Sequence, residues 1–431
     1  MPESTKRFLI VLMAVLLLGV ALRVGYVLSL SRERIEPDEL DYLNSATGLI
    51  EDGSFDKTVY YHVPPVVPLL FAGLFTFTGP SYTAARLLQC FFFIAAGTVL
   101  YLLGKELSGR LGGLLTLGVA AVYPYFVFFT GYAETEALAI AVIPAAILFA
   151  VRSVRSQRWR DCAFFGGLLA LATLTRAAVF LFVLAIPLVY LIGWGARSWR
   201  WFRATIVAVA TFCCLYLPWM AVNRSYFGEI IVTPTIGSGV MLYGTALRIE
   251  IPDSAERQRY FKNNIYSQYY YPPGASHRQR LEGDRYLRQE GRRILAAHLD
   301  EVPSLLLTNV MRFWQFYPHS PGDQQTAFWY KLIGLGSYGI IFPLMLIGAA
   351  AGLQRFRELS SVYGFITYFT LVHVALYGML RYRIPMDGLL IALAVLGFQS
   401  ALLWLKPALW NGMEQSVTGA DGSDAHYRSD S

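Results

Sequence analysis

Ten apolar runs, most of them about twenty residues long, dominate the sequence and restrict the class of fold. They cover residues 8–30, 82–103, 111–129, 136–151, 162–175, 177–194, 204–222, 328–352, 361–380 and 384–405. Because a helix rises 1.5 Å per residue, about twenty apolar residues cross the hydrocarbon core of a bilayer. Only 15% of the 431 residues are charged and 55% are hydrophobic, which excludes a water-soluble enzyme of this size. The sequence therefore predicts an all-α polytopic membrane protein.

Lysine and arginine residues gather in alternate loops, and this asymmetry predicts the orientation of the ten segments. One side receives Lys6, Arg7, Lys105, Arg110, Arg152, Arg155, Arg158, Arg160, Arg197, Arg200, Arg203, Arg355, Arg357 and Lys406. Since basic residues are retained on the cytoplasmic side, we expect both termini there and two long loops, residues 31–81 and 223–327, on the outer face. The formal charge of +7 then reflects cytoplasmic loops, and no nucleic-acid partner is indicated.

The segments and their loops form one predicted membrane domain, residues 1–406. Residues 407–431 are expected to be a disordered cytoplasmic tail. From Asn411 onwards this tail is rich in Ser, Gly and Asp and has almost nothing to bury.

An acidic cluster follows the first apolar run directly. Glu36, Asp38, Glu39 and Asp41 are four carboxylates within six residues, and their mutual repulsion is expected to raise the pKa of at least one of them. A carboxylate of that kind suits a general base. The alternative is an acidic helix start, with Pro37 at the first helical position and the carboxylates favoured by the helix dipole.

Aromatic residues and a histidine precede a short apolar stretch in the first long loop. Tyr60, Tyr61 and His62 lead through two prolines into residues 63–78, which resemble a turn that feeds a helix at the membrane surface. An interfacial aromatic belt explains the same pattern. A single histidine without partner ligands does not predict a metal site.

Arginines and carboxylates recur at the outer ends of the predicted segments. They are Arg86, Glu134, Glu136, Arg176, Arg381 and Arg383. Arginine is disfavoured on this face, so these residues require another explanation. A guanidinium fork matches phosphate oxygens, which favours binding of a phosphate at the membrane surface. Structural ion pairing with Glu134 or Glu136 is the alternative.

The second long loop combines tyrosines with a charged stretch. Tyr266, Tyr269, Tyr270 and Tyr271 precede residues 281–299, where Arg, Glu and Asp recur at helical spacing. Aromatic faces pack against sugar rings and acyl chains alike, so this loop could cover a substrate. A solvated amphipathic helix fits the charged stretch equally.

Nucleotide-binding motifs are not found. Gly334-Leu335-Gly336-Ser337-Tyr338-Gly339 fits G-x-G-x-x-G, but it lies inside an apolar run with no preceding strand. These glycines are typical of helix packing in membranes. The sequence therefore argues against a cytosolic reaction that uses ATP or a nucleotide sugar.

In order and spacing, these clusters resemble the family 39 type of integral-membrane glycosyltransferases, a GT-C class that includes protein mannosyltransferases and the aminoarabinose transferases acting on lipid A. The resemblance rests on Pro37-Asp38-Glu39 with Tyr42, His62-Val63-Pro64-Pro65, Ala85-Arg86-Leu87, Glu134 with Glu136, Leu174-Thr175-Arg176, Pro218-Trp219 and Arg381-Tyr382-Arg383-Ile384-Pro385. It implies a GT-C-like bundle that transfers a sugar from a polyprenyl-phosphate-linked donor to a glycan, lipid or protein acceptor.

The resemblance also implies roles for individual residues. Asp38 matches the general base, with Glu39 as its neighbour. The expected donor phosphate-binding residues are Arg86, Arg176, Arg381 and Arg383. The expected substrate-binding residues are Tyr42, Tyr61, His62, Glu134 and Glu136. No cofactor is obligatory in this scheme, although Asp38 and Asp41 could contribute to a divalent metal site. The expected location is a plasma (inner) membrane, with the active site on the outer face.

Two other classes of function remain open at this point. A glycan polymerase or ligase would share the lipid-phosphate donor, but Asp38 would be dispensable there. A secondary transporter would place charges inside the spans and show repeat symmetry between its halves, and neither feature is visible in the sequence.

Overall fold

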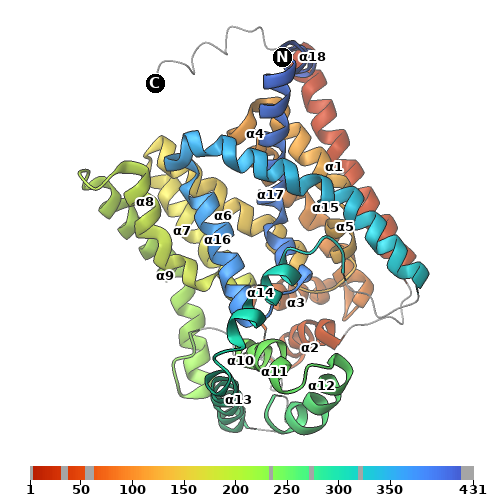
Figure 1. The fold of residues 1–431 in the computed structure, drawn as a ribbon, viewed down its shortest axis with the longest axis vertical. Helices are drawn as coiled ribbons and strands as arrows, with labels where there is room; N and C mark the ends of the chain where they lie inside the picture. The colour runs from red at the N-terminus through yellow and green to blue at the C-terminus, as the bar shows by residue number, and fades with distance from the viewer. Residues whose placement is uncertain are drawn as a thin grey trace.

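The computed structural model describes residues 3–30, 37–53, 63–232, 236–270, 276–318 and 324–418. Every regular element within these ranges is a helix (Figure 1). The predicted all-α class is therefore confirmed.

Each of the ten predicted apolar runs lies in helical structure. The long elements are α1 (Glu3–Ser29), α4 (Tyr82–Val122), α6 (Glu136–Ser156), α7 (Trp159–Thr175), η1 (Ala177–Ala185) continued by α8 (Ile186–Trp194), α9 (Arg200–Phe227), α15 (Gln324–Gly352), α16 (Phe356–Leu376) and α17 (Leu380–Leu405). In the described part of the chain, seven helical stretches are long and apolar enough to cross a membrane. The protein is thus multi-pass, and the count of ten crossings stays a prediction.

The count of seven is lower for two reasons. Two of the stretches contain two predicted runs each, and the run 162–175 lies in α7, which has only 17 residues and is not among the seven. Helix α4 holds the run 82–103 and most of the run 111–129, and it is broken at Ser108 and Gly109, where Gly109 adopts φ 78°. A short helix, α5 (Pro124–Thr130), completes the second run. Helices α15 and α16 are separated only by the short turn η4 (Leu353–Arg355).

The two long loops also fold into helices. They contain α2 (Pro37–Glu51), α3 (Val66–Thr78), α10 (Ile236–Met241), η2 (Leu242–Ala246), α11 (Leu247–Glu250), α12 (Ser254–Tyr260), η3 (Phe261–Tyr270), α13 (His277–Ala297) and α14 (Val302–Phe313). These elements gather towards one end of the molecule, and the amino terminus and α18 (Pro407–Thr418) lie at the opposite end (Figure 1). This arrangement agrees with the prediction that both loops share one face.

Local sequence accounts for the starts of these loop helices. Pro37 is the first residue of α2, and Asp38 and Glu39 occupy its first turn, where carboxylates interact favourably with the helix dipole. In α13, Ser276 and Gln279 form a capping box. The acidic helix start and the amphipathic helix that the sequence offered as alternatives are therefore both present.

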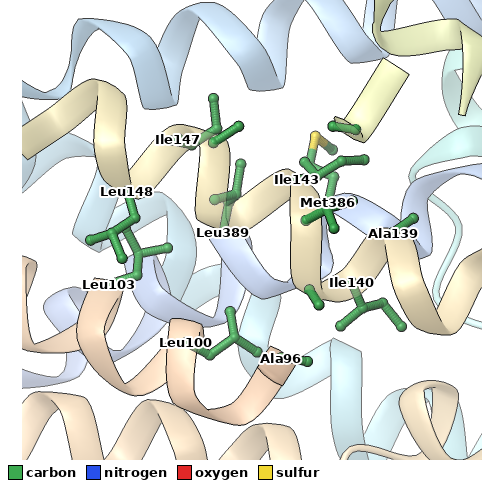
Figure 2. Close-up of a cluster of buried hydrophobic side chains, with 14 of the residues drawn as sticks. Ala96, Leu100, Leu103, Ala139, Ile140, Ile143, Ile147, Leu148, Met386 and Leu389 are labelled. Carbon is green, nitrogen blue, oxygen red and sulfur yellow. The ribbon is translucent and has the colours of Figure 1, made fainter. Parts of the chain in front are cut away.

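Helix α6 is the centre of the core. Figure 2 shows its apolar side chains packed between α4 and α17. The labelled residues of this cluster are Ala96, Leu100, Leu103, Ala139, Ile140, Ile143, Ile147, Leu148, Met386 and Leu389, all buried. Because α6 begins at Glu136 and α17 begins at Leu380, this packing fixes the first turns of both helices relative to each other.

Helices α15 and α17 approach each other at a pair of glycines. A Cβ atom at Gly348 would lie 1.8 Å from the Leu393 carbonyl oxygen, and one at Gly397 would lie 2.0 Å from that of Leu344. Only glycine fits at this crossing, as expected where membrane helices pack through small residues.

The start of the predicted tail differs from the expectation. Residues 407–418 form α18, whose Trp410 is 1% exposed. Burial of this one large side chain gives the segment an apolar anchor, which its Ser, Gly and Asp content concealed. The remainder of the predicted tail, residues 419–431, lies outside the described residues.

Candidate active site

A cavity of about 640 Å³ opens among the helix ends that face the two long loops. Its polar lining comes from α2, from the turn before α6, from the end of α7 and from the start of α17. The charged residues and tyrosines on these segments are Asp38, Asp41, Tyr42, Glu134, Glu136, Arg176, Arg381 and Tyr382. The rest of the lining includes apolar residues such as Phe180, Leu181 and Val372. A cavity lined by both charged and apolar side chains can accept an amphiphilic ligand.

Arg381 connects three carboxylates in the polar lining of this cavity. Its Nε donates to Glu136 Oε1 at 2.7 Å, and one Nη donates to Asp38 Oδ2 at 3.1 Å. The other Nη contacts Glu134. Glu134 and Glu136 are buried, whereas the Asp38 side chain is 65% exposed. Asp38 is therefore the carboxylate of this group that an incoming molecule can reach.

Arg176 is held less tightly. Its Nη1 lies 3.4 Å from both Glu136 Oε1 and Thr135 Oγ1, and its guanidinium carbon lies 5.4 Å from the centre of the Tyr382 ring. These contacts are long for charge-assisted hydrogen bonds. Arg176 thus keeps donor capacity on the cavity side.

The structure does not bring Glu39 and Arg86 to the cavity. They form a buried bidentate pair, in which Arg86 Nε donates to Glu39 Oε1 at 3.0 Å and Nη2 donates to Oε2 at 2.8 Å. Glu39 Oε1 also accepts a hydrogen bond from the Ala133 amide. Gln89, one turn after Arg86, donates to the Glu134 carbonyl oxygen at 2.6 Å. These contacts fix α2 and the turn that carries Glu134.

Arg383 is likewise away from the cavity, although it is only two residues from Arg381. Its Nε donates to Asp387 Oδ1 at 2.9 Å, and its Nη1 donates to the Gln315 carbonyl oxygen at 2.8 Å. The guanidinium carbon lies 3.5 Å from the centre of the Tyr338 ring. Successive residues of a helix point about 100° apart, so a spacing of two places the two arginines on different faces.

The remaining predicted residues divide into two groups. Tyr61 and His62 lie outside the described residues. Tyr42 lines the cavity beside Asp38, and burial together with the charges of Glu136 and Asp38 raises its pKa well above 10, so the phenol is neutral at pH 7. Tyr266 of the second long loop also lines the cavity, which places that loop over the site.

Sequence reasoning missed two polar residues. His373 lines the cavity, and its Nδ1 lies 2.8 Å from the Phe369 carbonyl oxygen. Asp387 neutralises Arg383. Both lie inside apolar runs, and an ionisable residue at membrane depth is itself a signal of function or of pairing. The spacing of four between Arg383 and Asp387 was a second signal, because such residues face each other on a helix.

The charges around the cavity do not balance. Four carboxylates line it, namely Asp38, Asp41, Glu134 and Glu136, against two arginines. Oxygen Oε2 of Glu136 is buried without a hydrogen-bond partner. Even so, the described residues contain no group of three or more His, Cys, Asp or Glu side chains placed to hold a metal ion. Asp38 and Asp41 therefore supply at most two carboxylate ligands to a metal ion at this site.

Comparison with known proteins finds one family match and several similar solved structures. Residues 62–221 match the family described as dolichyl-phosphate-mannose-protein mannosyltransferase. The archaeal oligosaccharyltransferase AglB from Archaeoglobus fulgidus, solved with an inhibitory peptide and a dolichol-phosphate, aligns with 96% of this chain and 52% of its own, at 16% identity and a TM-score of 0.58. The apo form of the oligosaccharyltransferase from that organism aligns over the same shares, at 15% identity and a TM-score of 0.59.

A third solved structure is similar at a lower level. ArnT from Cupriavidus metallidurans, bound to undecaprenyl phosphate, aligns with 91% of this chain and 77% of its own, at 15% identity and a TM-score of 0.43. That score is too low to support the fold assignment. No curated protein matches the chain.

The archaeal structures match this chain over only part of their own length, which limits the conclusion to the fold. The chain spans about half the length of the archaeal oligosaccharyltransferase, so the comparison establishes the fold and leaves the activity to be argued from the site. The predicted resemblance is confirmed: this multi-pass membrane protein has a GT-C-like fold, and its residues 62–221 carry the sequence pattern of the dolichyl-phosphate-mannose-protein mannosyltransferase family.

Proposed function

We propose that the protein transfers a sugar from a polyprenyl-phosphate-linked donor to an acceptor hydroxyl, at the membrane face that carries the two long loops. The observation that carries this proposal is the cavity, which brings the exposed carboxylate of Asp38 next to Arg381 and is also lined by apolar residues. The family match over residues 62–221 supports the same class of donor.

The donor would contact both the apolar and the charged lining of the cavity. Its isoprenoid chain would lie against Phe180 and Leu181, and Leu181 is 52% exposed at the surface of the bundle. Its phosphate would be held by Arg176 and Arg381, because guanidinium groups bind phosphate oxygens in a bidentate manner. The archaeal oligosaccharyltransferase was solved in complex with a dolichol-phosphate, which is an amphiphile of this kind.

The reaction is a single displacement. The acceptor hydroxyl oxygen attacks the anomeric carbon, the bond between that carbon and the phosphate oxygen breaks, and Asp38 takes the hydroxyl proton. Negative charge grows on the departing phosphate, where Arg176 and Arg381 stabilise it. Attack from the face opposite the phosphate inverts the anomeric configuration.

The residues outside the cavity would act as positioning residues. The pair of Glu39 and Arg86 holds α2, and therefore Asp38, against the turn at Ala133. Glu134 and Glu136 would orient Arg381, since both contact its guanidinium group. In this assignment Glu39 is not a second base, because both of its oxygens already accept hydrogen bonds from Arg86.

We place this site on the outer face of a plasma membrane, with both termini in the cytoplasm, because the short loops at the end opposite the cavity are rich in lysine and arginine. A single cysteine introduced at the exposed Asp52 tests the orientation. We expect a membrane-impermeant maleimide to label it in intact cells; labelling only after lysis would reverse the topology.

The central test is transfer of radiolabelled sugar from polyprenyl-phosphate donors by the protein reconstituted in lipid. Asp38→Asn is expected to lower the rate at least 100-fold, as is typical for loss of a general base, and to leave donor binding intact. The matched control is Asp52→Asn, which makes the same change at the exposed carboxyl-terminal end of α2 and should keep full activity.

Other results would redirect the proposal. Full activity in Asp38→Asn would favour a polymerase or ligase whose essential groups are the arginines and the second loop. If the wild-type protein does not bind the donor, the lipid-phosphate donor is ruled out. The secondary transporter then becomes the favoured function.

A further inference from the structure

A second group of arginines lies in the second long loop, outside the lining of the cavity. Arg248 lies in α11, Arg257 lies in α12, and Arg312 lies in the last turn of α14. None of the three is among the residues that line the cavity. Two tyrosines lie beside this group. The guanidinium carbon of Arg257 lies 5.6 Å from the Tyr243 ring centre, and that ring lies 6.3 Å from the ring of Tyr377, which also lines the cavity.

These arginines have few partners for their donors. Arg248 donates from one Nη to the side-chain oxygen of Asn309, and Arg257 donates from Nη1 to the carbonyl oxygens of Ile251 and Pro252. The Nε of Arg257 is buried and unpartnered, and the residue is only 4% exposed. Within the described residues Arg312 forms neither a hydrogen bond nor an ion pair. Each guanidinium has five donors, so most of this capacity is unused.

The group also has no counter-charge in the described part of the chain. Glu250 follows Arg248 by two residues, but it pairs with Arg293 on α13. Burial, together with the positive charges of Arg312 and Arg257, lowers the pKa of Arg248 to about 10. It therefore remains protonated at pH 7, and the three like charges face one another uncompensated.

The position of α14 indicates where a compensating anion would come from. Phe313 and Asn309 on one face of this helix are buried, whereas Leu307 and Met311 on the other face are about 60% exposed. An amphipathic helix with this pattern lies in the interface of a bilayer, with its apolar face among the acyl chains. Arg312, the neighbour of Met311, is then at the depth of lipid phosphates.

We propose that Arg248, Arg257 and Arg312 form a binding site for the phosphate of an anionic membrane lipid, beside the cavity but outside its lining, and independent of the proposed sugar transfer. The site anchors the outer loops to the leaflet: α14 inserts its apolar face while the arginines hold the phosphate. A free phosphate has the same chemistry, and the experiment separates the two sources.

The test is native mass spectrometry of the full chain, purified in detergent and titrated with phosphatidylglycerol, phosphatidylcholine or inorganic phosphate. Arg248→Gln/Arg312→Gln should bind phosphatidylglycerol about tenfold more weakly than wild type. The matched control is Arg259→Gln/Arg292→Gln, which removes the same charge from exposed positions of α12 and α13 and should bind within twofold of wild type. Arg312→Gln alone breaks no contact of the described structure, so its weaker binding would not reflect misfolding.

The outcomes are distinct. Specific loss with phosphatidylglycerol but no binding of inorganic phosphate assigns the site to a lipid, and loss with both assigns it to phosphate from either source. An equal loss of phosphatidylglycerol binding in the control double variant would show that net charge alone causes the effect. If phosphatidylcholine binds as tightly as phosphatidylglycerol, apolar contacts alone would explain lipid binding. Either of these two results overturns the proposal.

Discussion

Arg381 and Arg383 are two residues apart in α17, and their surroundings differ in almost every respect. The Arg381 side chain is 31% exposed, lines the cavity and contacts three carboxylates from α2 and the start of α6. The Arg383 side chain is fully buried and is neutralised by one carboxylate, Asp387, of its own helix. The difference shows that an arginine at the end of a membrane helix can either face a ligand cavity or form a structural ion pair.

What distinguishes the two is where the remaining donors point. Arg383 directs Nη1 to backbone carbonyls of the segment after α14, and Asp387 Oδ2 accepts from Tyr123. The pair thus ties α17 to the end of α4 and to the second long loop. Arg381 contacts groups that also face the cavity, so a ligand phosphate can compete for its donors. We therefore expect stability to depend on Arg383 and transfer to depend on Arg381.

The largest effect is expected from Arg383→Ala. It leaves Asp387 as an unpaired buried charge, which typically costs about 3–5 kcal/mol of the free energy of unfolding. Thermal unfolding in detergent, followed by circular dichroism, measures the loss.

The double variant Arg383→Met/Asp387→Leu separates this charge effect from lost packing. It replaces the pair by apolar side chains of similar volume, so we expect it to be more stable than Arg383→Ala and close to wild type. A double variant as unstable as the single one would show that the carbonyl contacts at Gln315, and not the charge balance, hold the segment.

The next effect concerns catalysis. Arg381→Gln removes a cation from the proposed phosphate site, and loss of one such electrostatic contact typically lowers turnover about 100- to 1000-fold. The rate of sugar transfer in reconstituted protein measures it, with donor saturating.

Arg155 provides a matched control at the opposite end of the bundle. It too bridges two carboxylates, Glu106 and Glu358, at 2.7 Å each, but it lines no described cavity. Arg155→Gln leaves these carboxylates paired with Arg152 and Arg355, so we expect unchanged transfer. Equal loss of transfer in both variants would mean that Arg381 also has only a structural role.

Local sequence patterns predicted the fold well because membrane helices are specified locally. Each run of apolar residues satisfies its own backbone hydrogen bonds, so periodicity and length alone locate the helices. The basic loops also grouped the two long loops on one face. The turns at Glu134, Arg176 and Arg381 were recognisable because each interrupts an apolar run, and the structure brings all three to one cavity.

Pairing across the fold could not be predicted in this way. The contact between Glu39 and Arg86 joins residues 47 positions apart, and nothing in either segment specifies its partner. Arg86 and Arg383 therefore had the same expected role as Arg176 and Arg381. Only the packing of α2, α4, α6 and α17 separates the arginines that face a cavity from those that are enclosed.

The smallest expected effect is the contribution of Tyr42, a neighbour of Asp38 and Arg381, to the pH dependence of stability. Tyr42 lies beside Asp38, and burial raises its pKa above 10 although Arg381 and Arg176 oppose the shift. Above pH 10 the unfolded chain therefore releases this proton before the folded chain does, and stability falls as the pH rises, by at most about 1.4 kcal/mol per pH unit. Tyr42→Phe removes this contribution, so we expect the wild type to lose stability relative to the variant between pH 10 and 11, and their difference to be constant between pH 6 and 9. A difference that changes below pH 9 would mean that Tyr42 ionises at lower pH, and that the arginines, rather than burial, control the charge beside Asp38.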